Sequence, residues 1–160
     1  MTRSLILVPT RELSEQVFGH LKSLLVYCDK DVVVSNVSSG SNTHLQRYAP
    51  HLISSLLYRY VGVRIQLSDK PDIVIATPSR ALTLLSSKVL SLGSLETLVI
   101  DEADLILSYG HDEDVRQIFS GAHLPNIYQS FLMSATMTED VNMLKGLTLR
   151  NPVSTLTNFI

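Results

Sequence analysis

Short aliphatic runs alternate with segments of helical spacing along this chain of 160 residues, and this alternation constrains the fold more than any other feature. Residues 5–8 are entirely aliphatic, and residues 73–76 and 95–100 are rich in Leu, Ile and Val. Such runs are typical of strands that are buried on both faces of a sheet. Strands separated by helices predict an α/β fold with a mostly parallel sheet and helices on both faces.

The segments between these runs have the spacing of amphipathic helices. One apolar face predicts a helix that ends near Tyr27, and its members are Leu13, Val17, Leu21, Leu24 and Leu25. A second face is formed by Leu45, Tyr48, Leu52 and Leu56. Further helices are expected after Thr77 and over residues 138–147, and further strands over residues 32–34, 128–133 and 153–156.

Composition limits the classes of protein that this chain can represent. With 160 residues and 45% hydrophobic residues, one domain with one core is expected. The net charge is -2, so binding to nucleic acid would need locally placed donors rather than a basic surface. Cys28 is the only cysteine, which fits a reducing compartment, and no apolar stretch approaches the ~18 residues of a membrane span. The five histidines lack the spacing of metal ligands.

Three carboxylates occupy four positions directly after the strand expected at residues 95–100, namely Asp101, Glu102 and Asp104. Carboxylates at a buried strand end are costly unless they meet a metal, a proton or a hydrogen-bond donor. In α/β sheets that partner is usually a ligand. Because Mg²⁺ that bridges phosphates prefers oxygen ligands, the tetrapeptide indicates metal-assisted phosphate chemistry. The simpler alternative is a helix N-terminus whose macrodipole favours acidic residues.

Polar motifs also follow three other strands, at residues 9–12, 77–80 and 134–136. Parallel strands end at a shared edge, so these loops are expected to converge with residues 101–104. Thr10 and Thr77 suit helix capping, and helix N-termini beside arginine suit phosphate. Capping alone remains open for the threonines, and ordinary surface ion pairs remain open for Arg11 and Arg80.

Residues 9–13, 77–80, 101–104 and 134–136 resemble, in this order, motif Ia, motif Ib, the name-giving motif and motif III of DEAD-box ATP-dependent RNA helicases. The resemblance is to the first of the two RecA-like domains of that family, and it extends from about residue 5 to residue 153. It implies a RecA-like sheet of the P-loop NTPase type. It also implies RNA-stimulated ATP hydrolysis that remodels RNA duplexes or RNA–protein complexes.

The resemblance assigns roles to individual residues. Asp101 is expected to hold Mg²⁺ of Mg-ATP, through water, and Glu102 to orient and deprotonate the attacking water. Asp104 is expected to reach the hydroxyls of Ser134 and Thr136, which would couple the ATP site to the motion of the sheet edge. Contacts to the backbone of single-stranded or duplex RNA are expected from Pro9, Thr10, Arg11, Gly40, Thr77, Pro78, Ser79 and Arg80. Gly40 takes the place of the family's double-glycine loop, and a plain turn glycine is an open alternative.

Three features depart from the family pattern. The sequence contains no Gly-x-x-x-x-Gly-Lys-Ser/Thr loop and no upstream adenine-reading glutamine motif, so residues 1–157 are expected to form a partial helicase ATP-binding domain. Residues 158–160 are expected to start the linker to a second RecA-like domain, which normally completes the ATP site. The segment at about residues 48–66 is longer than usual, and it is either an insert or a gene-model artefact.

Residues 36–38, 70–72 and 128–133 resemble the nucleolar branch that matures the large ribosomal subunit. That branch implies pre-ribosomal RNA as partner, a role in rRNA processing and a place in the nucleolus of the nucleus. Three functions remain open. They are a fragment of an ATP-dependent RNA helicase that is inactive alone, a non-catalytic module that binds the RNA backbone, and another P-loop ATPase class, against which motifs Ia and Ib argue.

The missing first strand, loop and helix predict an unprotected sheet edge. This edge is expected beside residues 5–7 or residues 98–100. Unpaired edges favour pairing with other chains. The isolated chain is therefore expected to be poorly soluble or dimeric.

Overall fold

Five parallel strands form one sheet in the computed structural model, which describes residues 1–28, 31–38, 67–68, 70–120 and 122–155. The strands are β1 (Ser4–Leu7), β2 (Val34–Asn36), β3 (Ile73–Ala76), β4 (Thr97–Ile100) and β5 (Gln129–Leu132). They lie in the order β2-β3-β1-β4-β5, and each adjacent pair is parallel.

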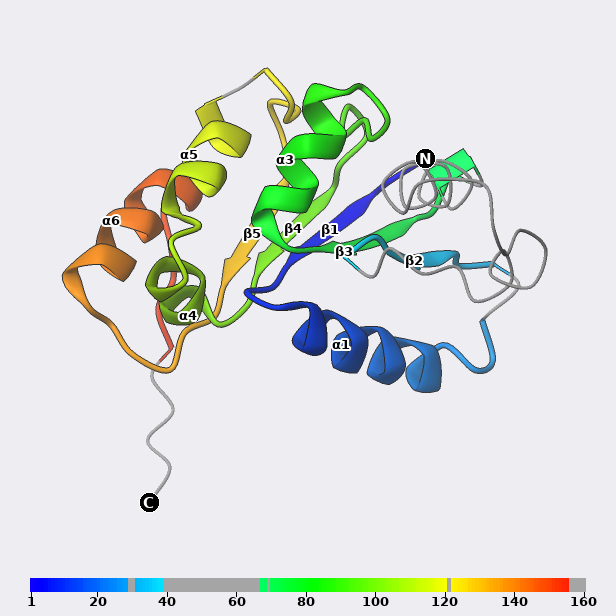
Figure 1. Cartoon of the computed structure of the whole chain (residues 1–160), viewed down its shortest axis with the longest axis horizontal. Helices are drawn as coiled ribbons and strands as arrows, with labels where there is room; N and C mark the ends of the chain where they lie inside the picture. The colour runs from blue at the N-terminus through cyan, green and yellow to red at the C-terminus, as the bar shows by residue number, and fades with distance from the viewer. Residues whose placement is uncertain (29–30, 39–66, 69, 121, 156–160) are drawn as a thin grey trace, which may run out of the picture.

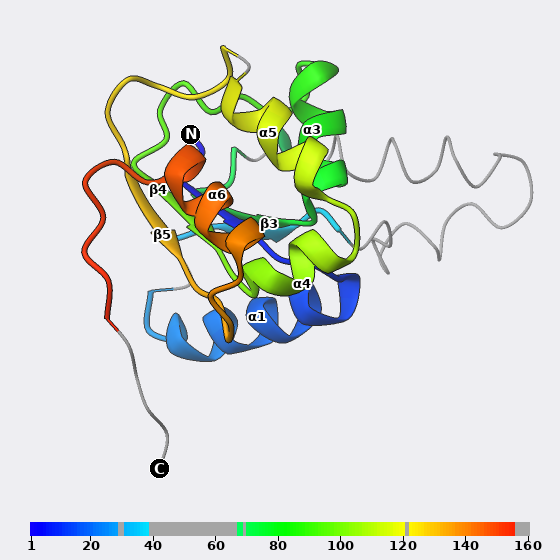
Figure 2. The ribbon, with the colours of Figure 1, turned by 90° about the vertical axis from the view of Figure 1, so that its left-hand side faces the viewer.

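Helices cover both faces of this sheet. They are α1 (Arg11–Leu24), α3 (Pro78–Ser86), α4 (Ala103–Ser108), α5 (Asp112–Ser120) and α6 (Glu139–Thr148). Helix α1 lies on one side, against β2 and β3, while α3 and α5 pack together on the other side (Figures 1 and 2). The predicted α/β fold with a parallel sheet and helices on both faces is confirmed.

The core forms where the aliphatic strands meet the helices. Leu5, Leu7, Val74 and Leu98 on the strands are fully buried, and so is Ile106 on α4. Burying such a side chain contributes about 1.5–3 kcal/mol. The aliphatic run of β3 is therefore explained by burial on both faces, whereas in β1 and β4 full burial alternates along the strand and Ile6 and Val99 are only half-buried.

Strand β2 lies two residues later than the strand expected at residues 32–34. The Val33 carbonyl accepts from the N–H groups of Asp72 and Ile73, and the Val33 N–H donates to the Asp72 carboxylate at 3.0 Å. These bonds anchor the segment before the strand. The strand itself continues through buried Asn36, whose side-chain amide has hydrogen-bond partners. The apolar pattern therefore identified only Val34 of the three residues that form β2.

The predicted apolar face of the first helix is wrong at Leu24. That side chain is 77% exposed, and the helix ends at Leu24 rather than near Tyr27. The chain turns at this point, with the Cys28 N–H bonded to the Leu25 carbonyl. The fully buried side chain of the helix is Ser14, which a hydrophobic pattern cannot identify.

The strand expected at residues 153–156 is wrong for its described part. Residues 153–155 form no strand, and Val153 is 94% exposed. A groove of about 740 Å³, lined by β5 on one side and residues 149–153 on the other, separates this segment from the sheet. The segment therefore lacks a neighbouring strand within the described part of the chain.

The outer strands of the sheet are β2 and β5, not the strands named in the sequence-based expectation. Strand β1 lies between β3 and β4, and β4 lies between β1 and β5. Among the described residues, no strand pairs with the outer side of β5. Within the described part of the chain, the sheet thus ends at β2 on one side and at residues 129–132 of β5 on the other.

Several predictions lie outside the described residues. They concern the helical face at residues 45–56, the segment at about residues 48–66, Gly40 and the linker at residues 158–160. Across the described ranges, no helix is both long and apolar enough to cross a membrane.

Candidate functional site

The strand ends are in register, and this brings the predicted loops together. Leu7 pairs with Ala76 and with Ile100, and Ile100 pairs with Leu132. The loops after β1, β3, β4 and β5 therefore leave the sheet at one edge, on the side where α1 and α4 begin (Figure 1). Backbone bonds join neighbouring loops there, since the Asp101 N–H donates to the Leu7 carbonyl at 2.9 Å.

The acidic loop after β4 has a strained backbone. Glu102 adopts φ 53° and ψ 53°, the left-handed conformation that costs a residue with a side chain about 1–3 kcal/mol. The Glu102 N–H donates to Oδ1 of Asp101 at 3.0 Å, which orients that carboxylate. Glu102 precedes α4 but makes no side-chain capping bond. Its carboxylate is therefore not used to cap the helix that follows.

Asp104 connects the loop after β4 to the loop after β5. Its Oδ2 accepts from Oγ1 of Thr136 at 2.9 Å and from the Thr136 N–H at 3.2 Å. Partial burial acts to raise the pKa of Asp104, but the hydrogen bonds from Thr136 and from the Leu105 backbone outweigh it and hold the pKa below its ordinary value. The contact expected between Asp104 and Thr136 is thus present.

Ser134 contributes less to the contact with Asp104 than Thr136 does. Its hydroxyl donates to the Thr136 carbonyl at 2.7 Å and contributes only the weakest of the effects that lower the pKa of Asp104. Ser134 therefore shapes the loop that presents Thr136. A further backbone bond, from the Ala103 N–H to the Met133 carbonyl at 2.9 Å, strengthens the connection between the two loops.

Two helices start at the same edge with threonine at the N-cap position. Oγ1 of Thr10 accepts from the Leu13 N–H at 3.1 Å, so Thr10 caps α1. Thr77 stands before Pro78 at the start of α3, but its side chain makes no capping bond, contrary to the expectation. Pro9 and Pro78 are buried, so they shape these loops rather than present a surface.

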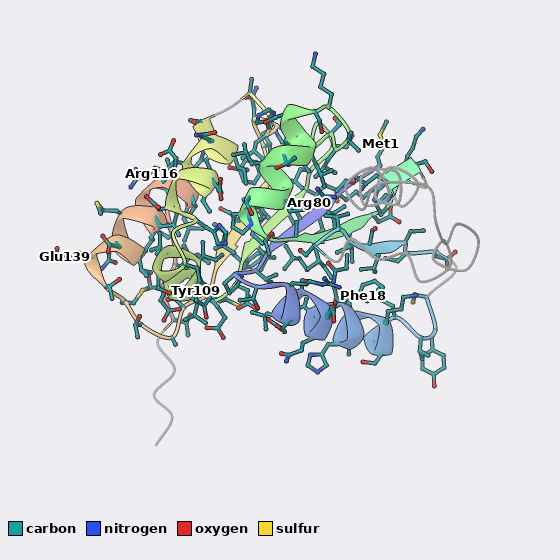
Figure 3. The ribbon with its side chains drawn as sticks, viewed as in Figure 1. Met1, Phe18, Arg80, Tyr109, Arg116 and Glu139 are labelled. Carbon is teal, nitrogen blue, oxygen red and sulfur yellow. The ribbon has the colours of Figure 1, made fainter. Side chains whose placement is uncertain are left out.

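The two arginines of these loops have partners in the chain. Nε of Arg11 lies 3.2 Å from Oε1 of Glu15, and both side chains are more than half exposed. This is the surface ion pair that the sequence left open, and such pairs contribute only about 0.2–1 kcal/mol. Nε of Arg80 donates to the Val37 carbonyl at 3.3 Å (Arg80 is labelled in Figure 3). Ser79 beside it is exposed.

Three polar residues that connect these loops are not evident as functional residues from the sequence. Ser14 is fully buried, Asn36 is 6% exposed, and Ser38 is half-buried. Asn36 contacts both serines through hydrogen bonds. The only indication in the sequence is that Ser14 and Asn36 are polar residues inside segments of otherwise apolar spacing.

The donors at the β4 end fit the metal side of an ATP site. In the described ranges no cluster of three or more His, Cys, Asp or Glu residues is arranged to hold a metal. Mg²⁺ at phosphates needs only one or two carboxylates and keeps several waters, which Asp101 and Glu102 match. The sequence supplies no glycine–lysine phosphate loop, so these residues fit one half of such a site.

Comparison with known proteins identifies relatives of the whole segment. The family model described as DEAD/DEAH box helicase matches residues 1–144. ATP-dependent RNA helicase dbp9 of Aspergillus oryzae is 43% identical over 153 residues, and that of Aspergillus niger is 45% identical over 152 residues. The matched segments cover 96% and 95% of this chain but 22% of each relative, so the chain spans about a fifth of their length.

A solved structure shows the same fold. The crystal structure of the yeast DEAD-box splicing factor Prp28 matches with a TM-score of 0.70 and 25% sequence identity, over 91% of this chain and 30% of that one. The RecA-like architecture expected from the motifs is confirmed by this match. Together with the family model over residues 1–144, it shows that the chain belongs to the DEAD/DEAH box helicase family.

Proposed function

We propose that this chain is part of an ATP-dependent RNA helicase and carries the carboxylate half of its ATP-hydrolysing site. The observation that carries the proposal is the register of the strand ends, which places Asp101 and Glu102 in one row with the loops at residues 9–11 and 77–80. The names of relatives that match almost the whole chain support it.

The carboxylates have separate roles in this proposal. Asp101, oriented by the Glu102 N–H, holds Mg²⁺ through water. Glu102 orients the attacking water and accepts its proton at the carboxylate. Mg-ATP, when bound, supplies the phosphoryl group and the charge that these residues act upon. Asp104 transmits the state of this loop to β5 through Thr136.

RNA is bound through its phosphate backbone. Thr10, Arg11, Thr77, Ser79 and Arg80, together with Gly40, provide hydroxyl, cationic and backbone donors at two helix N-termini. The weak ion pair between Arg11 and Glu15 is exchanged for a phosphate. Local donors of this kind allow RNA binding at a net charge of -2. We further propose pre-ribosomal RNA as target, a second RecA-like domain as partner and the nucleolus as location.

A second candidate is a non-catalytic module that binds the RNA backbone. The observation that favours it is the lack of a glycine–lysine phosphate loop in the sequence. In this reading the loops at residues 9–11 and 77–80 bind RNA, while Asp101 and Glu102 hydrolyse nothing.

One experiment separates the two candidates. ATP hydrolysis with and without RNA is measured for this chain and for a chimaera in which the preceding segment of the Aspergillus oryzae relative is joined upstream. We expect RNA-stimulated hydrolysis by the chimaera, its loss on Glu102→Gln, and RNA binding without hydrolysis by the chain alone. Hydrolysis by the chimaera that survives Glu102→Gln contradicts the catalytic role. A chimaera that binds RNA but never hydrolyses ATP favours the module.

A further inference from the structure

The end of β2 lies between the starts of two helices. Helix α1 packs under β2 and β3, and α3 begins directly after β3, the neighbour of β2 (Figure 1). Residues 36–38 therefore lie close to both loops that we propose to bind RNA. Two of the three side chains there, Asn36 and Ser38, are polar, although the site is largely buried.

A continuous chain of hydrogen bonds runs from one loop to the other. Oγ of Ser14 donates to the Arg11 carbonyl at 2.6 Å and accepts from Nδ2 of Asn36 at 3.1 Å. Oδ1 of Asn36 accepts from the Ser38 N–H at 3.0 Å. Oγ of Ser38 in turn accepts from the Thr77 N–H at 2.8 Å. This series of hydrogen bonds therefore connects the backbone of Arg11 with the backbone of Thr77.

The chemistry of the central residue is specific. A neutral amide both donates through Nδ2 and accepts through Oδ1, and Asn36 uses both functions here. An aspartate would lose the donor and bring a charge into a buried site, and a leucine would lose both functions. Buried polar groups of this kind keep their partners because an unpaired group is costly to bury.

The same segment also contacts the first turn of α3. Nε of Arg80 donates to the Val37 carbonyl at 3.3 Å. Residues 36–38 thus touch Thr77 and Arg80 on one side and, through Ser14, Arg11 on the other. The hydrogen bonds that connect Arg11 with Thr77 use only the backbone of these two residues. They therefore occupy no side chain to which we assign a contact with RNA.

We propose that Asn36, acting through Ser14 and Ser38, is a positioning residue that holds the loops at residues 9–11 and 77–80 at the spacing needed to bind one RNA strand together. This inference rests on the proposed RNA binding. The covalent backbone limits the spacing of successive phosphates on one RNA strand, so two loops bind that strand together most tightly when their relative position is preorganised. Asn36 itself touches no RNA.

The test uses the full chain, a single-stranded oligouridine labelled with a fluorophore, and hydrogen exchange of the Thr77 amide. Asn36→Leu interrupts the series of hydrogen bonds at its central residue, and Ser38→Ala removes only the acceptor of the Thr77 N–H. We expect about fivefold weaker RNA binding or more from each, together with faster exchange at Thr77. Ser38→Thr, which keeps the hydroxyl, should restore both readouts.

A matched control separates positioning from general stability. Ser130 on β5 donates its hydroxyl to the Thr148 carbonyl at 3.0 Å, far from the loops along the order of the sheet. Ser130→Ala therefore removes one serine hydrogen bond of similar kind, and RNA binding should stay within about twofold of the wild type. If Ser130→Ala weakens binding as much as Ser38→Ala, the effect reflects stability and the positioning role is overturned.

The failures of the two proposals are distinguishable. If the wild-type chain binds oligouridine and Ser38→Ala binds it equally well, the positioning role is wrong while RNA binding stands. If the wild-type chain shows no RNA affinity at all, the proposed RNA function fails, and with it the role built upon it. Because Ser38 is half-buried, its replacement tests the inference even where Asn36→Leu does not fold.

Discussion

Glu102 combines local strain with the proposed chemistry. At φ 53° its backbone is in a region that glycine adopts freely and residues with a Cβ do not. The carboxylate can be predicted from the sequence but the strain cannot, because backbone angles at a strand end depend on the packing of the loop that follows. The strain persists only because the surrounding hydrogen bonds hold it, including Ala103 N–H to the Met133 carbonyl.

Replacing Glu102 by glycine and by alanine separates strain from chemistry. Both variants lose the carboxylate, but alanine keeps a Cβ in the left-handed conformation. We expect Glu102→Gly to have a free energy of unfolding about 1 kcal/mol above that of Glu102→Ala. Urea unfolding of the two proteins measures the difference. Equal free energies of unfolding would show that the loop relaxes and stores no strain.

The Asp104 contact with Thr136 depends on pH in a defined direction. Because the pKa of Asp104 is held below its ordinary value, the bonds favour the ionised carboxylate, so their contribution is present at neutral pH and is lost as pH falls through the lowered pKa. In an NMR titration the Thr136 amide resonance should move in acid together with the Asp104 carboxyl resonance. In Thr136→Val the pKa of Asp104 should rise. An unchanged pKa in that variant would exclude the hydroxyl as a cause.

Thr10 and Thr77 occupy equivalent positions before α1 and α3 but make different hydrogen bonds. The Thr10 side chain caps α1 by accepting from the Leu13 N–H, whereas the Thr77 side chain makes no capping bond. The backbone N–H of Thr77 donates to Oγ of Ser38 instead. We expect Thr10→Ala to lower the free energy of unfolding by about 1 kcal/mol and Thr77→Ala by clearly less. Thermal and urea unfolding of both variants provide the comparison. A cost for Thr77→Ala equal to that for Thr10→Ala would mean that Thr77 stabilises α3 in another way.

Elements with strong apolar patterns were predicted well, and elements stabilised by polar contacts were not. The aliphatic run at residues 73–76 coincides with β3. Strand β2 was misplaced because its last residue, Asn36, is stabilised inside the protein by Ser14, a partner 22 positions earlier in the sequence. Residues 153–155 have a strand-like composition but no strand because a groove lies where a neighbour would be. The spacing of apolar residues indicates which residues form a helix or strand, but it does not indicate which other elements pack against it.

The arrangement of the whole sheet explains why the site was easier to predict than the strand order. Any parallel sheet places the loops after its strands at one edge, so the convergence of residues 9–11, 77–80 and 101–104 did not depend on knowing the neighbours. The order β2-β3-β1-β4-β5 does depend on them, and no pattern within a strand specifies its neighbours. This is why an exposed edge was expected beside β1 or β4, whereas the outer strands are β2 and β5.

The open edge of β5 makes the behaviour of the isolated chain predictable. The Gln129 N–H donates to the carbonyl of Glu96, just before β4, and the Met133 N–H donates to that of Ile100 on β4, so by alternation the backbone groups of Ser130 and Leu132 point to the free side. Residues 124–138 contain no charged residue, and exposed Phe131 lies within this stretch. Proteins usually protect such edges with charge or proline, and β5 has neither.

We therefore expect the isolated chain to self-associate through β5. The apparent mass from light scattering after size-exclusion chromatography should rise with protein concentration. Phe131→Lys should suppress the rise, because a charge on the edge strand repels its own copy across a symmetric contact. Leu24→Lys, at an exposed leucine of α1 on a different part of the molecule, should leave association unchanged. A wild-type chain that stays a monodisperse monomer and unfolds cooperatively at all concentrations would show that the edge of β5 is protected within a single copy.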